Sequence, residues 1–356
     1  PETIVGQVRQ SRTLAGIDEV IASGKGIAEF WEGKFACFEY ESVMAREIGT
    51  SETIDWADGT STQMSSAQVY DYVFHGGQPL MISGNGTIFK YDTKGVIPGL
   101  LERWYAERKE LQAKAKEAYG TDMYDFWDKR QLVKKINLNS AYGALLNAGS
   151  RFFDQRLGQS TTLCGRLVAR HMAGSVNDCL TGEKDHMGKA IIYGDTDSCY
   201  FSAYPMVKKD VEEGKMEWTK DIAVGLYDSI ADQVNESFPA FCERAFHTPR
   251  RQGDLIKGGR ESVSLKGLFI KKKRYAILIY DMEGHRLDTH GTPGKVKAMG
   301  LDLKRSDTPK VIQDFLSDIL LSVLTGADRD IIITKVRDFK LLFTERPAWE
   351  KGTPKR

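Results

Sequence analysis

The spacing of apolar and polar residues divides much of the chain into helical segments. Apolar positions recur at helical spacing over residues 98–119, with Pro98 at the start and Gly120 after the end, which predicts one long helix. A second helix is predicted from about residue 122 to 147, and the short connection makes the two an antiparallel pair. Further helices are expected over residues 156–180, 217–246 and 308–325.

Other segments alternate with the period of two that is typical of strands. Residues 190–202 predict a hairpin with two aspartates at its tip, and residues 262–281 predict further strands. A turn-dense stretch at 55–66 and a hairpin signal at 85–95 precede the first long helix. The pattern therefore predicts an α+β fold, in which a sheet carries the aspartate hairpin and a helical pair projects from it.

The distribution of charged residues along the chain indicates what kind of partner it binds. The chain has 356 residues, 41% of them apolar, which suffices for a sizeable core and two or three subdomains. Its net charge is only +1, but eight basic residues and one acidic residue lie between Lys129 and Arg170, and seven basic and one acidic lie between Lys257 and Arg274. Such local basic fields favour a protein that binds an anion on one surface.

Cysteine, histidine and hydropathy patterns exclude other classes. The five cysteines have no paired spacing and their number is odd, so we expect reduced thiols. The six histidines are scattered without ligand spacing, which argues against zinc. No apolar run in this sequence approaches the length of a membrane span, and we expect neither a membrane segment nor a signal peptide.

The stretch YGDTDS (193–198) places Asp195 and Asp197 at the tip of the predicted hairpin. Gly, Asp and Thr are good turn formers, so a simple turn is one interpretation. Two carboxylates held this close repel each other unless a cation lies between them. The alternative interpretation is a divalent metal site.

The second helix carries a polar face. Lys135, Asn139 and Tyr142 lie at i, i+4 and i+7, and Gly143 follows where a close approach by another group would explain a glycine. A solvated polar face is the plain alternative, which the large ring of Tyr142 weakens. The opposite face is expected to pack inward through Val133, Ile136, Ser140 and Ala144.

Two further basic features need an explanation. Arg108 falls on the apolar stripe of the first helix, where it needs an anionic partner or must extend its head into water. The stretch KKKRY (271–275) puts four consecutive cations within a predicted strand, on both of its faces. Lysines that protect an edge strand from aggregation are the plain alternative. Four in a row exceed that need, and a phosphate backbone is the natural counter-charge.

Taken together, these motifs resemble those of family B DNA polymerases. YGDTDS (193–198), KINLNSAYG (135–143) and KKRY (272–275) appear in the order and approximate spacing of three motifs of that family. The chain is most similar to the replicative polymerases of T-even-type tailed phages. That narrower resemblance rests on PETIVG at the start, RFFD (151–154), DMEG (281–284), MGLDLKRSDTPK (299–310) and PAWEKGTPKR at the end.

The resemblance implies a role for each motif. Asp195 and Asp197 would be catalytic carboxylates that hold two Mg²⁺ ions, and Glu261 matches an acidic residue near those metals. Lys135 and Arg108 would hold the triphosphate of a dNTP. Asn139 would support the nucleotide pocket, and Tyr142 and Gly143 would line the nascent base pair and the template. The primer–template duplex would be contacted by Lys272, Lys273, Arg274 and Tyr275.

The resemblance also implies a division of the chain and its partners. Residues 1–94 would be a palm-associated segment, 95–147 the fingers, 148–300 the palm and 301–356 the start of a helical thumb. The expected partners are primer–template DNA, dNTPs, a second polypeptide or a further region with an exonuclease domain, and a sliding clamp. The expected location is the cytoplasm of a phage-infected bacterial host.

Two departures from the family pattern stand out. A further cation often follows the fingers arginine by four residues, and here that position is Gln112. The family's other metal aspartate lies in a DxxSLYPS motif just upstream of the PET segment, with which this sequence starts. We therefore expect either an excised fragment or one piece of a split polymerase, inactive by itself.

Two other functions remain open. A DNA-binding subunit could keep the polymerase fold with an incomplete metal site. A glycosyltransferase could also use an Asp-x-Asp metal site, but that reaction leaves KKKRY and the Lys-Asn-Tyr face unexplained.

Overall fold

The computed structural model describes residues 3–8, 51–289 and 291–352. The chain divides into two compact units, Pro1–Gly174 with Ser237–Ile256, and Ser175–Glu236 with Lys257–Arg356. Helices α7 (Gln155–Thr181) and α9 (Lys220–Phe246) contribute to both units. The predicted α+β class is confirmed, with antiparallel sheets and several long helices. Residues 9–50, much of the expected palm-associated segment, lie outside the described residues.

The first unit contains a five-stranded antiparallel sheet in the order β3-β2-β1-β5-β4. Strand β1 is central and pairs Gly6 with Trp56 on one side and with Ile88 on the other. Branched strand residues and Phe241 of α9 form the core beneath the sheet. The hairpin expected at 85–95 is present only in part: residues 87–90 form β5, but the strand that pairs with it, β4, lies before this range. The strands are β1 (Ile4–Val8), β2 (Ser51–Trp56), β3 (Ser61–Ser65), β4 (Leu80–Ile82) and β5 (Thr87–Lys90), and short helices α4 (Ser66–Tyr70) and η1 (Asp71–His75) follow β3.

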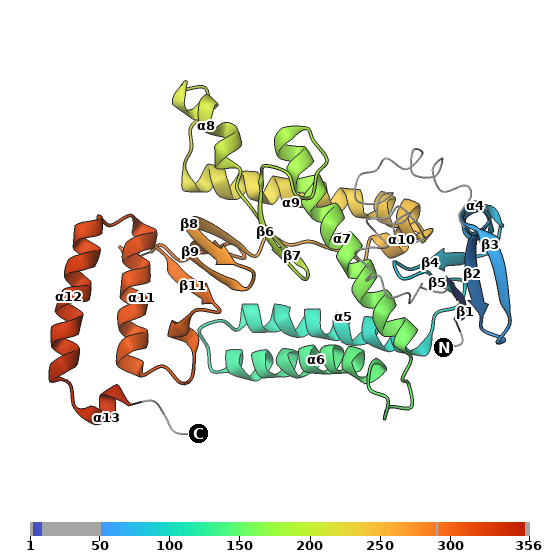
Figure 1. The fold of residues 1–356 in the computed structure, drawn as a ribbon, viewed down its shortest axis with the longest axis horizontal. Helices are drawn as coiled ribbons and strands as arrows, with labels where there is room; N and C mark the ends of the chain where they lie inside the picture. Colours follow the sequence, from blue (N-terminus) through green and yellow to red (C-terminus); the bar gives the residue numbers. More distant parts are fainter. Residues whose placement is uncertain (1–2, 9–50, 290, 353–356) are drawn as a thin grey trace. The chain divides into compact units, whose positions relative to one another are not determined.

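The predicted helical pair is confirmed as α5 (Val96–Glu117) and α6 (Met123–Leu145), which lie antiparallel in Figure 1. Polar contacts join the two helices. Lys134 of α6 pairs with Glu107 of α5, and Lys114 of α5 lies over the ring of Trp127, 5.0 Å from its centroid. The expectation that Val133 and Ile136 pack inward is wrong, since their exposed fractions are 54% and 53%.

The second unit has a four-stranded antiparallel sheet around β9, which pairs with β8 on one side and with β11 and β10 on the other. Residues 276–280 of β9 are all buried, which explains the continuous apolar run in the sequence. Helix α11 packs on the sheet through Leu320 and Leu324. The strands are β8 (Ser262–Lys271), β9 (Arg274–Met282), β10 (His285–Arg286) and β11 (Lys295–Met299).

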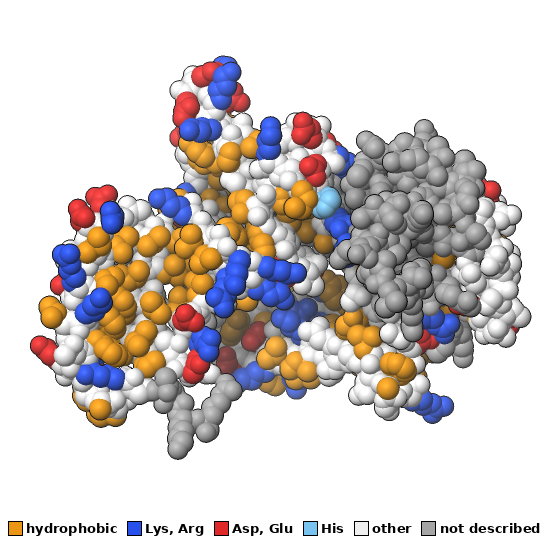
Figure 2. Space-filling view, viewed as in Figure 1, with side chains coloured by type: hydrophobic (Ala, Val, Ile, Leu, Met, Phe, Trp, Pro, Cys, Tyr) orange, Lys and Arg blue, Asp and Glu red, His pale blue; other side chains and the backbone are white. Residues whose placement is uncertain are grey.

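Helices α8 (Tyr204–Glu212) and α10 (Arg250–Gly253) and a 3₁₀ turn at Asp302–Lys304 precede α11 (Lys310–Thr325), and helices α12 (Arg329–Glu345) and α13 (Ala348–Lys351) follow it. Helix α12 packs on α11 through Phe315 and Phe339, whose rings stack with centroids 3.7 Å apart. Hydrophobic side chains also cover the visible face of α11 and α12 in Figure 2. Leu341 of α12 is 70% exposed.

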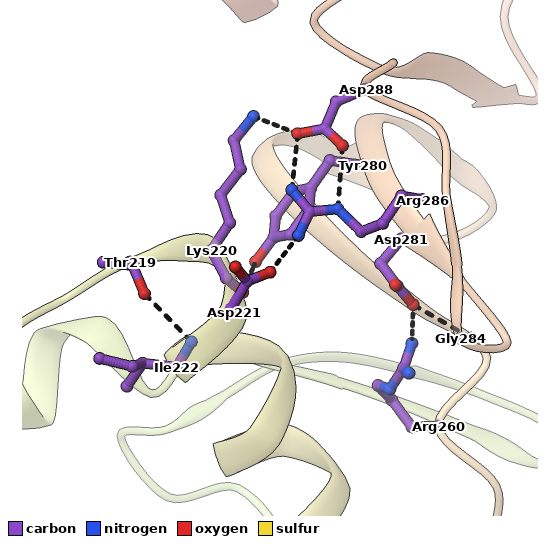
Figure 3. A network of polar contacts seen from close by, with 10 residues as sticks. All are labelled: Thr219, Lys220, Asp221, Ile222, Arg260, Tyr280, Asp281, Gly284, Arg286 and Asp288. Carbon is purple, nitrogen blue, oxygen red and sulfur yellow. Dashed lines mark hydrogen bonds and ion pairs between the residues drawn. The ribbon is translucent and has the colours of Figure 1, made fainter.

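A polar network joins the first turn of α9 to the sheet of the second unit (Figure 3). Asp288 accepts two hydrogen bonds from Arg286, at 2.9 and 2.8 Å, and one from Lys220 of α9 at 2.5 Å. These cations hold the pKa of Asp288 well below its ordinary value, first through the bond from Arg286. A second pair beside it joins Arg260 to the buried Asp281. The network fixes the loop from which β8 begins.

The cysteine expectation agrees with the structure. The four cysteines within the described ranges are free thiols, and Cys37 lies outside those ranges. Burial raises the pKa of Cys164 to about 11 and that of Cys199 to about 12. Among the described residues, no helix is long and apolar enough to cross a bilayer.

Candidate functional site

The predicted aspartate hairpin is confirmed as β6 (Ile191–Asp195) and β7 (Ser198–Phe201) in the second unit. Asp195 pairs with Ser198 across the tip, and the N–H of Asp197 donates to the carbonyl oxygen of Asp195 at 2.7 Å. Thr196 between them has a φ of 56°, a left-handed conformation uncommon for a residue other than glycine. The tip is therefore a tight turn that leaves Asp195 partly buried and Asp197 exposed.

The loop that leads into this hairpin is held by Asn177 of α7. Its amide nitrogen donates to Thr181 and to the carbonyl oxygen of Glu183, at 3.0 and 2.7 Å. Its amide oxygen accepts from the N–H of Ala190 at 3.1 Å. At the other end of the hairpin, the hydroxyl of Tyr227 accepts from the N–H of Ala203 at 3.1 Å. Both ends of the carboxylate hairpin are thus tied to helices of the second unit.

The KKKRY residues form the turn between β8 and β9, which corrects the prediction that four cations occupy both faces of a strand. Lys271 pairs with Arg274, so Lys272 and Lys273 are the two turn residues. Lys273 has a φ of 60°. A turn spreads like charges outward into solvent, and their mutual repulsion is smaller there than along a buried strand. We call residues 271–274 the basic turn.

The structure brings the basic turn and the carboxylate hairpin together. The ammonium nitrogen of Lys273 lies 3.9 Å from Oδ1 of Asp195. The backbone N–H of Lys273 donates to the hydroxyl of Tyr193 at 2.8 Å. Two motifs that are about 80 residues apart in the sequence are therefore neighbours in the fold. The cation of Lys273 also relieves part of the repulsion between the two carboxylates.

Four aromatic residues connect these two elements, and the sequence reasoning did not single out three of them. Tyr193 and Tyr200 of the hairpin pack on Phe269 and Tyr275 of β8 and β9, with ring centroids 5.3–5.9 Å apart. The hydroxyls of Tyr200 and Tyr275 are 2.7 Å apart. Burial and this bond raise the pKa of Tyr200. The sequence did contain one signal for Tyr193: the strand period of two places it on the same face as Asp195.

The donor atoms at the hairpin tip suit magnesium in kind, because carboxylate oxygens are the ligands that a hard divalent cation prefers. Asp195 and Asp197 supply two of them. In the part of the chain that the structure describes, no group of three or more His, Cys, Asp or Glu residues is placed to hold a metal. Glu261 accordingly joins no such group with the two aspartates. Its Oε1 accepts from Lys297 of β11 at 2.8 Å.

The other candidate residues lie on the helical pair of the first unit. Lys135 and Asn139 of α6 are exposed, Tyr142 is half-buried, and nothing lies within 4 Å of the place that a Cβ of Gly143 would take. The close approach expected at Gly143 is thus not made by the described chain. That position is open to a ligand instead.

Two contacts decide which cations of the helical pair are available. Lys134 is bound to Glu107 and, through that bond, holds the pKa of Glu107 below its ordinary value, whereas the neighbouring Lys135 is exposed. Arg108 donates from Nε to Oε1 of Gln131 at 3.2 Å. No carboxylate within the described ranges pairs with Arg108. The partner of this arginine is a neutral amide, so no described residue compensates its charge.

Comparison with known proteins shows the family of this chain. Residues 44–235, more than half of the chain, match the model of DNA polymerase family B. The chain belongs to this family. It is 32% identical over 203 residues to the DNA-directed DNA polymerase of Escherichia phage RB69, an alignment that covers 54% of this chain and 22% of the relative. The corresponding polymerase of Enterobacteria phage T4 is 30% identical over 224 residues, covering 56% and 23%.

Other DNA polymerases also match at lower identity. The DNA polymerase delta catalytic subunit of Mesocricetus auratus is 27% identical over 250 residues, which cover 69% of this chain and 19% of that protein. The matched region of this family B chain thus spans about a fifth of the length of these relatives. The family match includes the hairpin with Asp195 and Asp197 and the face with Lys135, and it ends before the basic turn.

Proposed function

We propose that this chain is the nucleotide- and DNA-handling part of a template-directed DNA polymerase of the T-even phage type. In this proposal residues 95–147 are the fingers, 148–300 the palm with 1–94 associated, and 301–356 the start of the thumb. The membership in family B and the identities of 32% and 30% to two phage polymerases support it.

One observation carries the proposal beyond the family match. The carboxylate hairpin and the basic turn come from separate motifs, and they meet at Lys273 and Asp195, 3.9 Å apart. DNA synthesis requires carboxylates for divalent metals and cations for a phosphate backbone at neighbouring positions. If the hairpin tip were a simple turn, or the lysines only protected a strand edge from aggregation, the carboxylate hairpin and the basic turn would not need to be neighbours.

The metal ligands in this proposal are Asp195 and Asp197, with Glu261 nearby as a peripheral acidic residue. Bound Mg²⁺, two ions in the complete site, would supply electrostatic stabilisation of the attacking and leaving oxygens in phosphoryl transfer. The role of the chain's own residues is to present two hard oxygen donors on a tight turn. Asp197 is exposed, and it has no ion pair among the residues that the structure describes.

The nucleotide and DNA contacts are assigned to separate sets. Lys135 and Arg108 bind the triphosphate, because the first is exposed and the second has a neutral partner, with no ion pair among the described residues. Asn139 supports the nucleotide pocket. The nascent base pair and the duplex contact the remaining residues, which are Tyr142 and Gly143 on α6 and Lys272, Lys273, Arg274 and Tyr275 at the basic turn.

The partners are primer–template DNA and dNTPs, with a sliding clamp as a further one. Since the two hairpin aspartates form no three-ligand group among the described residues, we propose that another carboxylate comes from elsewhere. A second polypeptide or a further region of the polymerase, which also carries the exonuclease domain, would supply it.

The division of labour can be tested with three lysine variants. Lys273→Ala should weaken binding of primer–template duplex and lower the slope of log affinity against log salt by about one unit, since one phosphate contact is lost. Lys135→Ala should leave duplex affinity unchanged and weaken binding of Mg²⁺–dNTP to the chain–duplex complex. Lys134→Ala is the matched control, because this lysine is already bound to Glu107.

Fluorescence anisotropy of a labelled duplex over a salt series measures the first quantity, and titration of the complex with dNTP measures the second. Equal defects in Lys273→Ala and Lys135→Ala would contradict the assignment of separate roles to the two clusters. A wild-type chain that binds no duplex at low salt would contradict the proposed function as a whole.

A second candidate function is a non-catalytic DNA-binding subunit with a polymerase fold. The two-carboxylate site favours it, because a subunit that only binds DNA needs no further metal ligand. Nucleotide addition in the presence of the completing segment separates the two candidates.

A further inference from the structure

The basic turn has an unusual backbone that requires support from its surroundings. Lys273 is a non-glycine residue in the left-handed region, with a φ of 60°. Such conformations persist where neighbouring groups hold them. Lys273 is also the second residue of a two-residue turn, where a backbone N–H points away from the ladder and needs another acceptor.

Tyr193 provides that acceptor. Its hydroxyl lies 2.8 Å from the backbone nitrogen of Lys273. Its ring is fixed by the aromatic cluster, with centroids 5.7 Å from Tyr200, 5.9 Å from Phe269 and 5.7 Å from Tyr275. A phenol held on three sides by other rings is a rigid hydrogen-bond acceptor.

The opposite side of the same turn is closed by Gly300, which follows β11. Gly300 has a φ of 63°, and a Cβ at this position would collide with the carbonyl oxygen of Lys273. The glycine therefore allows β11 to end directly against the turn. The peptide groups of Lys273 are enclosed between this backbone and the phenol of Tyr193.

Strand β6 contacts Lys273 twice. Tyr193 and Asp195 are two residues apart on the strand, so their side chains leave it on the same face. The first holds the backbone of Lys273, and the second lies 3.9 Å from its ammonium group. A shift of the basic turn would break both contacts, so the turn and the carboxylates are held as one geometric unit.

We propose that Tyr193 is a positioning residue, whose hydroxyl fixes the basic turn beside the carboxylate hairpin so that Lys273 is already oriented when duplex DNA binds. Tyr193 contacts no reacting atom in this proposal and acts through Lys273. The choice of duplex DNA as the ligand rests on the proposed function, whereas the positioning of the turn does not.

The test uses Tyr193→Phe, which removes only the hydroxyl. Its matched control is Tyr227→Phe, which removes a hydroxyl that also accepts a backbone N–H, that of Ala203, but at the end of β7 and not at the turn. Amide hydrogen exchange of residues 271–275 reports on the turn, and anisotropy reports on the affinity for primer–template duplex. Both are measured on the full 356-residue chain.

Tyr193→Phe should accelerate exchange at the turn and weaken duplex binding, each by about three- to tenfold, the value of one lost neutral hydrogen bond. Tyr227→Phe should match the wild type in both. Gly300→Ala, which displaces the turn from its other side while Tyr193 is intact, should also accelerate exchange at residues 271–275.

Unchanged exchange in Tyr193→Phe would overturn the proposal, as would faster exchange with wild-type duplex affinity. Lys273→Ala in the same assays separates this failure from failure of the proposed function. If Lys273→Ala binds duplex as tightly as the wild type, the assignment of the turn to DNA is wrong, irrespective of how Tyr193→Phe exchanges.

Discussion

At the scale of single residues, the acidic groups of the second unit differ in how their charge is compensated. Asp288 is bound by Arg286 and Lys220, and the buried Asp281 by Arg260. Asp195 has one cation at 3.9 Å, and Asp197 has no ion pair within the described ranges. The carboxylates with complete partners stabilise the fold, whereas those at the hairpin tip keep the capacity to bind an added cation.

Asp288 allows a prediction about acid stability. Its folded pKa is lowered by Arg286 and Lys220, so its contribution is complete above its ordinary value of about 4 and is lost as the pH falls further. The free energy of unfolding of the wild type should therefore exceed that of Asp288→Asn by a constant amount above about pH 5, and the difference should shrink below about pH 4.

Urea unfolding at a series of pH values measures this difference. Asp221→Asn is the control, because Asp221 also contacts Arg286 but is 86% exposed and should contribute little at any pH. A difference between wild type and Asp288→Asn that stays constant down to pH 3 would show that the network does not depend on this charge.

At the scale of elements, the carboxylate hairpin depends on what holds its ends. Asn177 is fully buried and makes two hydrogen bonds to the loop before β6, with Glu183 and Ala190, and a third with Thr181 at the end of α7. Gly188 in that loop lies so close to Asn177 that a Cβ would collide with the amide. The loop is therefore shaped around one side chain of α7, and the hairpin starts from a fixed position.

Asn177→Ala should lower the free energy of unfolding by about 2–3 kcal/mol, because buried backbone groups lose their partners. The matched control is Asn139→Ala, an exposed asparagine on α6, which should change stability by no more than about 0.5 kcal/mol. Both are measured by urea unfolding. An equal effect of the two substitutions would mean that the loop does not need Asn177.

The elements that the sequence predicted well are those with strong local periodicity and end signals. The α5–α6 pair has Pro98 and Gly120 as boundaries, and the hairpin has a turn-forming Gly-Asp-Thr-Asp tip. Helix α12 was missed, since its first turn contains the β-branched run Ile331–Thr334, which favours a strand locally. The basic turn was taken for strand because it contains no Gly, Pro, Asn or Asp.

Sequence reasoning found the candidate site residues that lie within a single motif, but not the contacts between separate motifs. The contact of Tyr193 with Lys273 joins residues 80 positions apart, and its cause is the packing of four aromatic rings. Periodicity gives the face of each residue within its own strand, but not the partner across the fold. The exposed Val133 and Ile136 show the same limit, since an apolar face does not tell which surface it meets.

At the scale of the whole molecule, this family B chain spans about a fifth of the polymerases that it resembles. Its hairpin offers two carboxylates, and a bound Mg²⁺ would need more oxygen ligands than the described residues bring together there. We therefore expect the chain to bind primer–template duplex by itself and to add nucleotides only when a further segment supplies another carboxylate.

Magnesium-dependent primer extension tests this account most directly. The chain is assayed alone, together with a polypeptide that carries the DxxSLYPS segment, and in the same mixture with Asp197→Ala. We predict no extension by the chain alone, template-directed extension by the mixture, and a loss of at least about 100-fold in the variant, which should still bind the duplex. Extension by the Asp197→Ala mixture at the wild-type rate would contradict the assignment of the carboxylate hairpin as the metal site.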